Sequence, residues 1–236
     1  MSAPEDGTVP HIIVLPGGGY GHHAYHEGEP VAQWLRSLGL SASVLHYPVA
    51  SVNGNAARHP GPIDAVRTRV AELRADGVGR LGILGFSAGG HLAGHAAMSG
   101  PSRSSATSHL VDAAILCYPV VSMQLPTHAG SRHNLMGRWA APWTRRALSV
   151  DRMVTRDAPP TFLRHTAEDA AVPVEHAYRL ASALAAHAVP HELHVYPRGR
   201  HGLGLVDGVP DGEQAGNAAD WTAACARWLR QLGWVS

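Results

Sequence analysis

Short apolar runs alternate with helical patterns along most of the chain. Six runs are brief and rich in aliphatic and β-branched residues, which is typical of buried strands; they lie at residues 11–18, 41–49, 80–87, 111–121, 160–169 and 191–197. Apolar residues at helical spacing predict helices at about 29–38, 63–75, 88–98, 174–187 and 218–232. Strand–helix alternation with apolar strands predicts an α/β protein whose mostly parallel sheet is covered by helices on both faces.

The periodicity is lost between residues 122 and 157, where Pro, Gly, Trp, Arg and His intermingle. We expect a short cap-like insertion that covers or walls a pocket. Trp139 and Trp143 either stack on a sugar, line an acyl pocket or anchor the insertion to the core. Ser131 and Asn134 are expected to fix the insertion through local hydrogen bonds.

Composition narrows the class of protein. The chain has 236 residues, 45% of them hydrophobic and 16% charged, which suits one globular domain over residues 1–236. The net charge is +1 and the arginines are interspersed with acidic residues, so we expect no nucleic-acid partner. Cys117 and Cys225 lie in apolar patterns, and we expect both to be buried without a disulfide framework.

The N-terminal region suggests where the protein resides. Residues 1–10 have no positive segment followed by an apolar one, so no signal peptide is expected. No run approaches the roughly 18–20 apolar residues of a membrane span. We therefore expect a cytoplasmic protein without a membrane partner; a homo-oligomer is compatible with the sequence, which indicates no number of subunits.

The pattern Gly85-Phe86-Ser87-Ala88-Gly89 stands between a predicted strand and a predicted helix. This context is that of a nucleophile elbow, in which flanking glycines permit a tight turn and the serine is raised at the start of a helix. The helix N-terminus adds N–H groups near developing negative charge. Ser87 is thus the candidate nucleophile of an α/β-hydrolase fold.

A serine hydroxyl needs a base, and the base needs an orienting group. In this fold the chain order is Ser, then Asp or Glu, then His. Asp169 follows a predicted strand, and His201 lies in the loop after the last strand. We predict Asp169 and His201 as the partners of Ser87, with Glu168 as the alternative acid. The competing histidines fall within strands or a helix, at His165, His187, His191 and His194.

The glycine-rich run 16–20, Pro-Gly-Gly-Gly-Tyr, follows the first strand. A backbone without Cβ atoms approaches a substrate closely, and an oxyanion requires N–H donors. A phosphate-binding loop is the alternative, but neither Gly-Lys-Ser/Thr nor G-x-G-x-x-G follows. We predict Gly18, Gly19 and Ala88 as the oxyanion donors.

Two groups of histidines invite a metal interpretation. They are His22, His23 and His26 with Glu27, and His91 with His95 one helical turn later. Neither group has zinc-ligand spacing or the H-E-x-x-H pattern. We expect the first group to line the entrance to the site and the second to pack beneath it, with no metal and no cofactor.

Several longer strings resemble a known family. The run 16–35 (PGGGYGHHAYHEGEPVAQWL), the run 85–95 (GFSAGGHLAGH), the run 127–137 (THAGSRHNLMG) and the run 158–205 are similar to acetyl-xylan-esterase-like α/β hydrolases, also labelled xylanase-B-like or BD-FAE-type. The family triad falls on Ser87, Asp169 and His201. The family often has Asp-Asp in the acid loop, where this chain has Glu168-Asp169, and the oxyanion string begins with Pro16 rather than the His of related lipases.

The resemblance implies a serine carboxylesterase that acts on short acyl esters, with acetylated sugars or xylo-oligosaccharides as its small-molecule substrates. The alternatives are a peptidase or amidase of the same fold and a catalytically inactive hydrolase-fold binding protein. A peptidase of this fold usually carries an extra domain that restricts access, for which this length leaves little room. A lipase for long chains would need a larger apolar lid than residues 122–157 offer.

Overall fold

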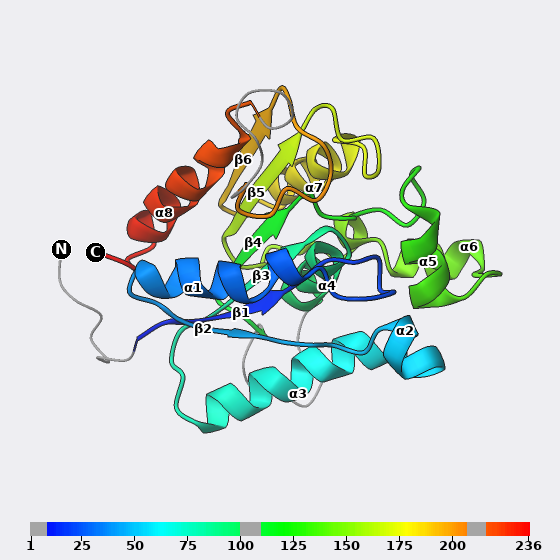
Figure 1. Cartoon of the computed structure of the whole chain (residues 1–236), viewed down its shortest axis with the longest axis horizontal. Helices are drawn as coiled ribbons and strands as arrows, with labels where there is room; N and C mark the ends of the chain where they lie inside the picture. The colour runs from blue at the N-terminus through cyan, green and yellow to red at the C-terminus, as the bar shows by residue number, and fades with distance from the viewer. Residues whose placement is uncertain (1–8, 100–109, 207–215) are drawn as a thin grey trace.

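The computed structural model describes residues 9–99, 110–206 and 216–236, and these contain a six-stranded sheet. Every neighbouring pair of strands is parallel, which confirms the predicted mostly parallel sheet (Figure 1). The strands are β1 (His11–Leu15), β2 (Ser41–Val44), β3 (Leu81–Phe86), β4 (Ala113–Cys117), β5 (Thr161–Thr166) and β6 (His191–Tyr196). All six predicted strands are therefore present, each of them shorter than the apolar run that predicted it.

The strand order is β2-β1-β3-β4-β5-β6. The chain first builds outward from β1 to β2, then returns past β1 and continues outward through β3 to β6. The order of strands thus reverses between β1 and β3. Ligands of open parallel sheets bind outside the carboxyl ends of the strands at such a reversal, because the connecting loops diverge there.

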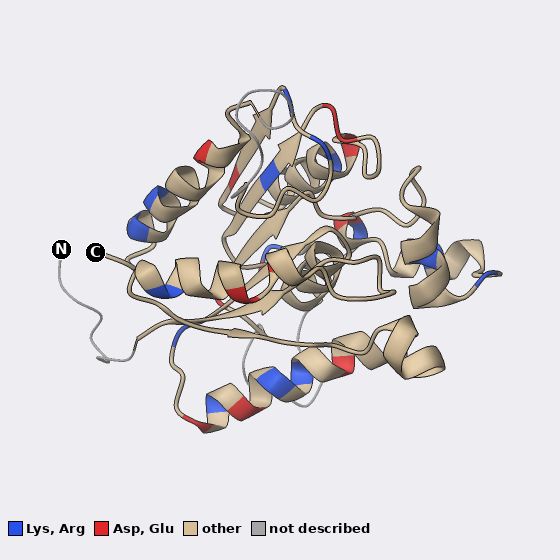
Figure 2. Ribbon diagram, in the orientation of Figure 1, with Lys and Arg blue, Asp and Glu red and all other residues tan. Residues whose placement is uncertain are grey.

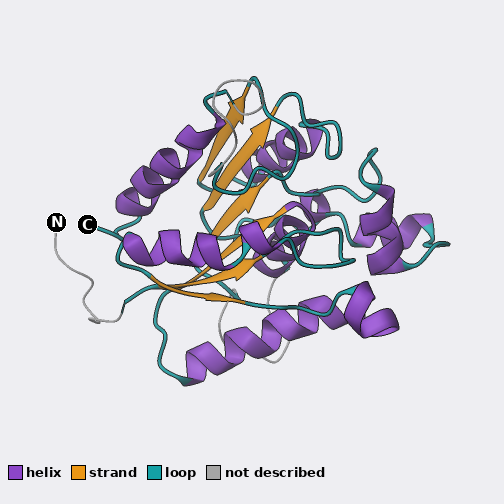
Figure 3. Ribbon diagram, in the orientation of Figure 1, coloured by secondary structure: helices purple, strands orange, loops and turns teal. Residues whose placement is uncertain are grey.

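Helices cover both faces of the sheet (Figures 1 and 3). The principal helices are α1 (Glu29–Ser37), α3 (Gly61–Ala75), α4 (Ser87–Met98), α7 (Glu175–Ala186) and α8 (Trp221–Gln231). Side chains of α1 and α8 pack on one face, and those of α3, α4 and α7 pack on the other. Alternate residues of β1 point to opposite faces, Ile12 and Val14 toward α1 and Ile13 and Leu15 toward α3 and α4.

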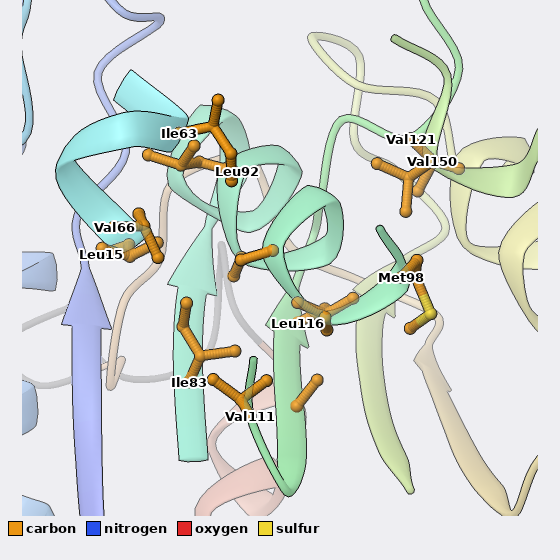
Figure 4. Close-up of a cluster of buried hydrophobic side chains, with 14 of the residues drawn as sticks. Leu15, Ile63, Val66, Ile83, Leu92, Met98, Val111, Leu116, Val121 and Val150 are labelled. Carbon is orange, nitrogen blue, oxygen red and sulfur yellow. The ribbon is translucent and has the colours of Figure 1, made fainter. Parts of the chain in front are cut away.

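The core beneath α4 fixes that helix on the sheet. Ile83 of β3 and Leu116 of β4 are fully buried, as is Leu92 of α4 (Figure 4). Burial of apolar surface contributes roughly 25 cal/mol per Å², so this cluster holds the start of α4 in a defined place. The predicted burial of Cys117 and Cys225 is confirmed, and both are free thiols.

Shorter elements surround the sheet. They are η1 (Tyr25–Glu27), α2 (Ala50–Asn53), η2 (Gly54–Ala57), α5 (Ala129–Met136), α6 (Pro142–Ala147), η3 (Val150–Arg152) and η4 (Ala218–Asp220). The predicted insertion at 122–157 contains α5, α6 and η3; α5 and α6 lie at one end of the molecule (Figure 1), and η3 packs against α4 and α7. Trp139 and Trp143 are 88% and 76% exposed, so the interpretation that they anchor the insertion to the core is wrong. Trp139 lies between α5 and α6, with the guanidinium carbon of Arg138 5.6 Å from the centroid of its ring, and Trp143 lies in α6.

Basic and acidic residues are interspersed along α3 (Figure 2). Arg67 forms an ion pair with Asp64, and Arg69 forms one with Glu72. Each pair is three residues apart in the sequence, with an N–O distance of 3.0 Å. Within the described part of the chain, no helix combines the length and apolarity that crossing a bilayer requires.

Candidate active site

Two loops meet where the strand order reverses. The loop at 16–20 leaves β1, and Ser87 follows β3, its parallel neighbour. A Cβ atom added to Gly17 would lie 3.1 Å from the Cβ of Ser87, so the glycine loop is packed directly against the serine. The pairing of β1 with β3 thus brings together two segments that are about seventy residues apart in the sequence.

Ser87 occupies a strained turn. Its φ angle is +52°, in the left-handed region that side chains rarely adopt. A Cβ on Gly85 would overlap the carbonyl of Gly89, and one on Gly89 would overlap the carbonyls of Leu15 and Pro16. Only glycine fits at these positions. The turn places Ser87 at the first position of α4, where the N–H groups of the first turn, including that of Ala88, have no partner within the helix.

The structure brings the three predicted partners together. Nε2 of His201 lies 2.8 Å from Oγ of Ser87, and Nδ1 of His201 lies 2.6 Å from Oδ2 of Asp169. The Ser87 residue is 8% exposed and the His201 side chain 23% exposed, so neither is fully closed off from solvent. In this arrangement Nδ1–H donates to the carboxylate, which leaves Nε2 to accept a proton from the serine.

Asp169 is buried and well supplied with donors. Its Oδ1 accepts from the N–H groups of Ala171 and Val172 at 3.0 and 2.9 Å. Burial alone would raise the pKa of Asp169, but the hydrogen bonds from His165, His201 and Val172 outweigh it and hold that pKa well below its usual range. Nε2 of His165 lies 3.4 Å from Oδ2 and donates mainly to the carbonyl of Val172 at 2.8 Å.

Glu168, the alternative acid, points elsewhere. Its residue is exposed, and its Oε2 accepts from the N–H of Gly199 at 3.3 Å. The two consecutive carboxylates thus have different environments: both lie just after β5, but Glu168 lies in an exposed turn whereas Asp169 is buried.

The glycine loop presents unpaired N–H groups. The N–H of Gly17 donates to Oε2 of Glu27 at 2.8 Å, whereas those of Gly18 and Gly19 donate to no other residue of the described chain. Nδ2 of Asn134, on α5, donates to the carbonyl of Gly19 at 2.9 Å. The expectation that Asn134 bonds locally is therefore wrong: it crosses to a loop 115 residues away, because α5 lies against that loop.

Ser131 does bond locally, since its N–H and hydroxyl both contact Nδ1 of His128 at the start of α5. The hydroxyl also lies beside the glycine loop, 3.4 Å from where a Cβ on Gly19 would stand. α5 is therefore packed against the candidate oxyanion loop.

The histidines serve as packing and hydrogen-bonding groups. Nδ1 of His91 lies 2.7 Å from the hydroxyl of Tyr20, and its Nε2 donates to the carbonyl of Leu148. Burial lowers the pKa of His91 to about 4 and that of His95 to about 3. Over residues 9–99, 110–206 and 216–236, no group of three or more His, Cys, Asp or Glu is arranged to hold a metal ion.

Sequence reasoning missed the place of Glu27. The expectation that it lines the entrance is wrong, since the residue is 2% exposed and lies behind the glycine loop. Its carboxylate accepts from the hydroxyl of Tyr118, 91 residues away. No local pattern signals such a contact, because only the pairing of distant strands brings the two side chains together.

The fold and this cluster of serine, histidine and aspartate define the class of α/β hydrolases. A family model described as the prolyl oligopeptidase family matches residues 63–232. The chain belongs to that family of α/β hydrolases.

Two named relatives are similar to this chain in sequence. Endo-1,4-beta-xylanase B from Butyrivibrio fibrisolvens is 33% identical over 206 residues, which cover 81% of this chain and 32% of the relative. An acetylxylan esterase from Xylanibacter ruminicola is 30% identical over 214 residues, which cover 86% of this chain and 42% of the relative. The chain thus spans less than half the length of either relative.

Solved structures resemble the whole chain. An acetyl ester-xyloside bifunctional hydrolase from Caldicellulosiruptor lactoaceticus matches with a TM-score of 0.86 at 38% identity, covering 99% of this chain and 86% of that one. A carboxylesterase from Lactobacillus plantarum WCFS1 matches with a TM-score of 0.81 at 25% identity, covering 100% and 92%. The resemblance to acetyl-xylan-esterase-like hydrolases is confirmed.

Proposed function

We propose that this protein is a serine esterase that hydrolyses short acyl esters, with acetyl groups on small sugars or xylo-oligosaccharides as the substrate class. The observation that carries the proposal is the chain of hydrogen bonds from Asp169 through His201 to Ser87, at 2.6 and 2.8 Å. The substrate class rests on the relatives, one of which is named an acetylxylan esterase and another an acetyl ester-xyloside hydrolase.

In the proposed reaction His201 accepts the proton of Ser87 while Oγ attacks the ester carbonyl carbon. The N–H groups of Gly18, Gly19 and Ala88 stabilise the oxyanion of the tetrahedral intermediate. The C–O bond to the alcohol then breaks, and His201 returns the proton to the departing alkoxide. Water attacks the acyl-enzyme in the same way, which releases the carboxylic acid and restores Ser87.

Asp169 holds the imidazole in the tautomer that this reaction needs. Its low pKa keeps the carboxylate ionised at neutral pH, so it stabilises the imidazolium that forms in each step without taking the proton itself. The sequence of steps needs no metal or organic cofactor.

The first test is hydrolysis of p-nitrophenyl esters from acetate to octanoate by the wild type, Ser87→Ala and a control, Ser37→Ala, at an exposed serine of α1. We expect the highest kcat/KM on acetate, and a loss on the order of 10⁵-fold or more in Ser87→Ala. The control should match the wild type. An equally active Ser87→Ala would overturn the assignment of the nucleophile.

Two further substrates separate the alternatives. Acetate release from acetylated xylo-oligosaccharides tests the sugar, and a p-nitroanilide series tests the peptidase that the family name suggests. Labelling of Ser87 by a fluorophosphonate separates an active hydrolase from an inactive binding protein. Anilide cleavage at rates comparable to those of the esters would favour the peptidase.

A further inference from the structure

A buried carboxylate lies behind the glycine loop at 16–20, which supplies the proposed oxyanion donors (the oxyanion loop). The proposed reaction does not use this carboxylate. Glu27, the last residue of η1, is 2% exposed. Its Oε2 accepts from the N–H of Gly17 at 2.8 Å, and its Oε1 accepts from the hydroxyl of Tyr118 at 2.5 Å. Both oxygens act as acceptors, as those of an ionised carboxylate do. Burying such a group is costly unless its lone pairs are used, so its presence calls for a physical reason.

Tyr118 connects Glu27 to the loop after β6 that contains His201 (the His201 loop). Its hydroxyl accepts from the N–H of Gly204 at 2.8 Å, and its ring packs edge-on against the ring of His201 with the centroids 4.9 Å apart. Burial and the adjacent Glu27 carboxylate raise the pKa of Tyr118 well above its usual range. The hydroxyl therefore stays protonated, donates to Glu27 and accepts from Gly204.

Arg164 completes the cluster from the other side. It is a fully buried residue of β5, and its guanidinium carbon lies 4.4 Å from the centroid of the Tyr118 ring. Its Nη2 donates to the carbonyl of Gly204 at 2.7 Å. The peptide groups of Gly204 are thus held by Tyr118 at the N–H and by Arg164 at the carbonyl. Tyr118 thus contacts Arg164 through its ring and Glu27 through its hydroxyl.

The residue before Glu27 reaches the same loop. Nε2 of His26 donates to the carbonyl of Gly202 at 2.9 Å. The short η1 helix is therefore connected to the His201 loop at two points, on either side of Leu203. His26 contacts the loop directly at Gly202, and Glu27 is connected to it at Gly204 through Tyr118. It also contacts the oxyanion loop at Gly17.

We propose that Glu27 is a positioning residue of the hydrolytic site: it sets the oxyanion loop and the His201 loop in one fixed relation through Gly17 and Tyr118. This proposal rests on the proposed esterase function. Both loops must be placed within a fraction of an ångström for the oxyanion donors and the base to act on one substrate. A single carboxylate that bonds to both supplies that relation.

The direction of the hydrogen bonds makes the proposal testable with an isosteric change. In Glu27→Gln the amide oxygen can accept from Gly17, but the amide nitrogen then donates to Tyr118. The Tyr118 hydroxyl would accept from both this amide nitrogen and Gly204, and its own proton would lose its acceptor. The opposite amide orientation sets two donors against each other at Gly17. In either orientation the side chain at position 27 keeps its shape, but one of the hydrogen bonds that join Gly17, residue 27 and Tyr118 is lost.

The experiment compares Glu27→Gln, Tyr118→Phe and the double variant with the wild type, Ser87→Ala and a control, Glu29→Gln. Glu29 is partly exposed and pairs with Arg36, so it is a matched carboxylate outside the cluster. Active sites are counted by fluorophosphonate titration, and kcat and KM for p-nitrophenyl acetate are expressed per titrated site. We expect kcat to fall about 10- to 100-fold in each single variant, with KM changed less than threefold.

Both residues act through the same series of hydrogen bonds. The kcat of the double variant should therefore lie no more than about threefold below that of the less active single variant. Glu29→Gln should match the wild type. A role confined to stability would lower the number of titratable sites and leave kcat per site unchanged, and that result would overturn the proposal. Additive losses in the double variant would overturn it as well.

The controls separate this proposal from the esterase proposal. An active wild type and an inactive Ser87→Ala, together with a Glu27→Gln whose kcat is within twofold of wild type, would overturn the positioning role alone. An inactive wild type would overturn both proposals. If Glu27→Gln does not fold, Tyr118→Phe carries the test by the same criteria, since it removes only one oxygen atom and keeps the ring against His201.

Discussion

Two neighbouring carboxylates acquire different chemistry from their surroundings. Asp169 is buried against His165 and His201 and accepts two backbone N–H groups, while Glu168 faces solvent and contacts Gly199. The difference arises because the chain turns directly after β5, where the N–H of Asp169 donates to the carbonyl of Thr166 at 3.4 Å, so the two side chains leave the turn toward different surroundings. At this scale, the role of a side chain is decided by burial and by the direction of its hydrogen bonds.

This contrast gives a prediction at the level of single residues. Asp169→Asn should lower kcat by on the order of 10³–10⁴-fold, because an amide at this position no longer favours the tautomer with a proton on Nδ1. Glu168→Gln is the matched control and should stay within about threefold of wild type. The measurement is kcat on p-nitrophenyl acetate at neutral pH, and equal losses in the two variants would contradict the assignment.

At the scale of elements, the insertion contributes to the site through one helix. α5 reaches the candidate oxyanion loop through Asn134, whose amide donates to the carbonyl of Gly19, while Trp139 and Trp143 remain exposed. α5 is therefore a wall that supports the loop. Its placement follows from packing across the chain rather than from its own amphipathic pattern, which is weak.

Removal of this support should loosen the loop. Asn134→Ala loses one hydrogen bond, worth about 1 kcal/mol, and we expect kcat/KM on p-nitrophenyl acetate to fall roughly three- to tenfold. Asn55→Ala, at an exposed asparagine of η2, should leave kcat/KM unchanged. An unaltered rate in Asn134→Ala at an unaltered melting temperature would show that the contact does not support the site.

At the scale of the whole molecule, buried histidines link stability to pH. His95 is 7% exposed and stacks on His59, with a ring centroid distance of 5.6 Å. Burial first, and then the neighbouring His91, His59 and Arg67, lower the pKa of His95 to about 3. The unfolded chain binds this proton near pH 6.5, whereas the folded chain does not until the pH is much lower. Stability is therefore lost as the pH falls from about 6.5 toward 3.

We expect His95→Phe to flatten this dependence, because phenylalanine keeps the stacked ring and does not titrate. Between pH 7 and pH 4.5 the wild type should lose roughly 2 kcal/mol more unfolding free energy than the variant. His187→Phe, at an exposed histidine beside α7, should follow the wild-type curve. Urea unfolding at pH 7, 5.5 and 4.5 measures the difference, and parallel curves for His95→Phe and wild type would contradict it.

The sequence by itself determined the succession of strands and helices along the chain and the position of the candidate nucleophile turn. These depend on local periodicity and on a short motif whose glycines are needed at Gly85 and Gly89 for steric reasons. The chain order of serine, acid and histidine followed from the fold, and the structure places all three within hydrogen-bond distance. The strand ends were less well predicted, because apolar runs such as 41–49 continue past the last paired residue, Val44.

Only the tertiary structure decided which polar groups meet across the site. Glu27 reaches Tyr118 over 91 residues, and Asn134 reaches Gly19 over 115 residues. The pairing of β1 with β3 and of β3 with β4 brings such residues together, and the register of those pairs is set by the packing of the whole sheet. A hydrogen bond between distant side chains leaves no periodic trace in the sequence, whereas the burial of a strand or helix face does.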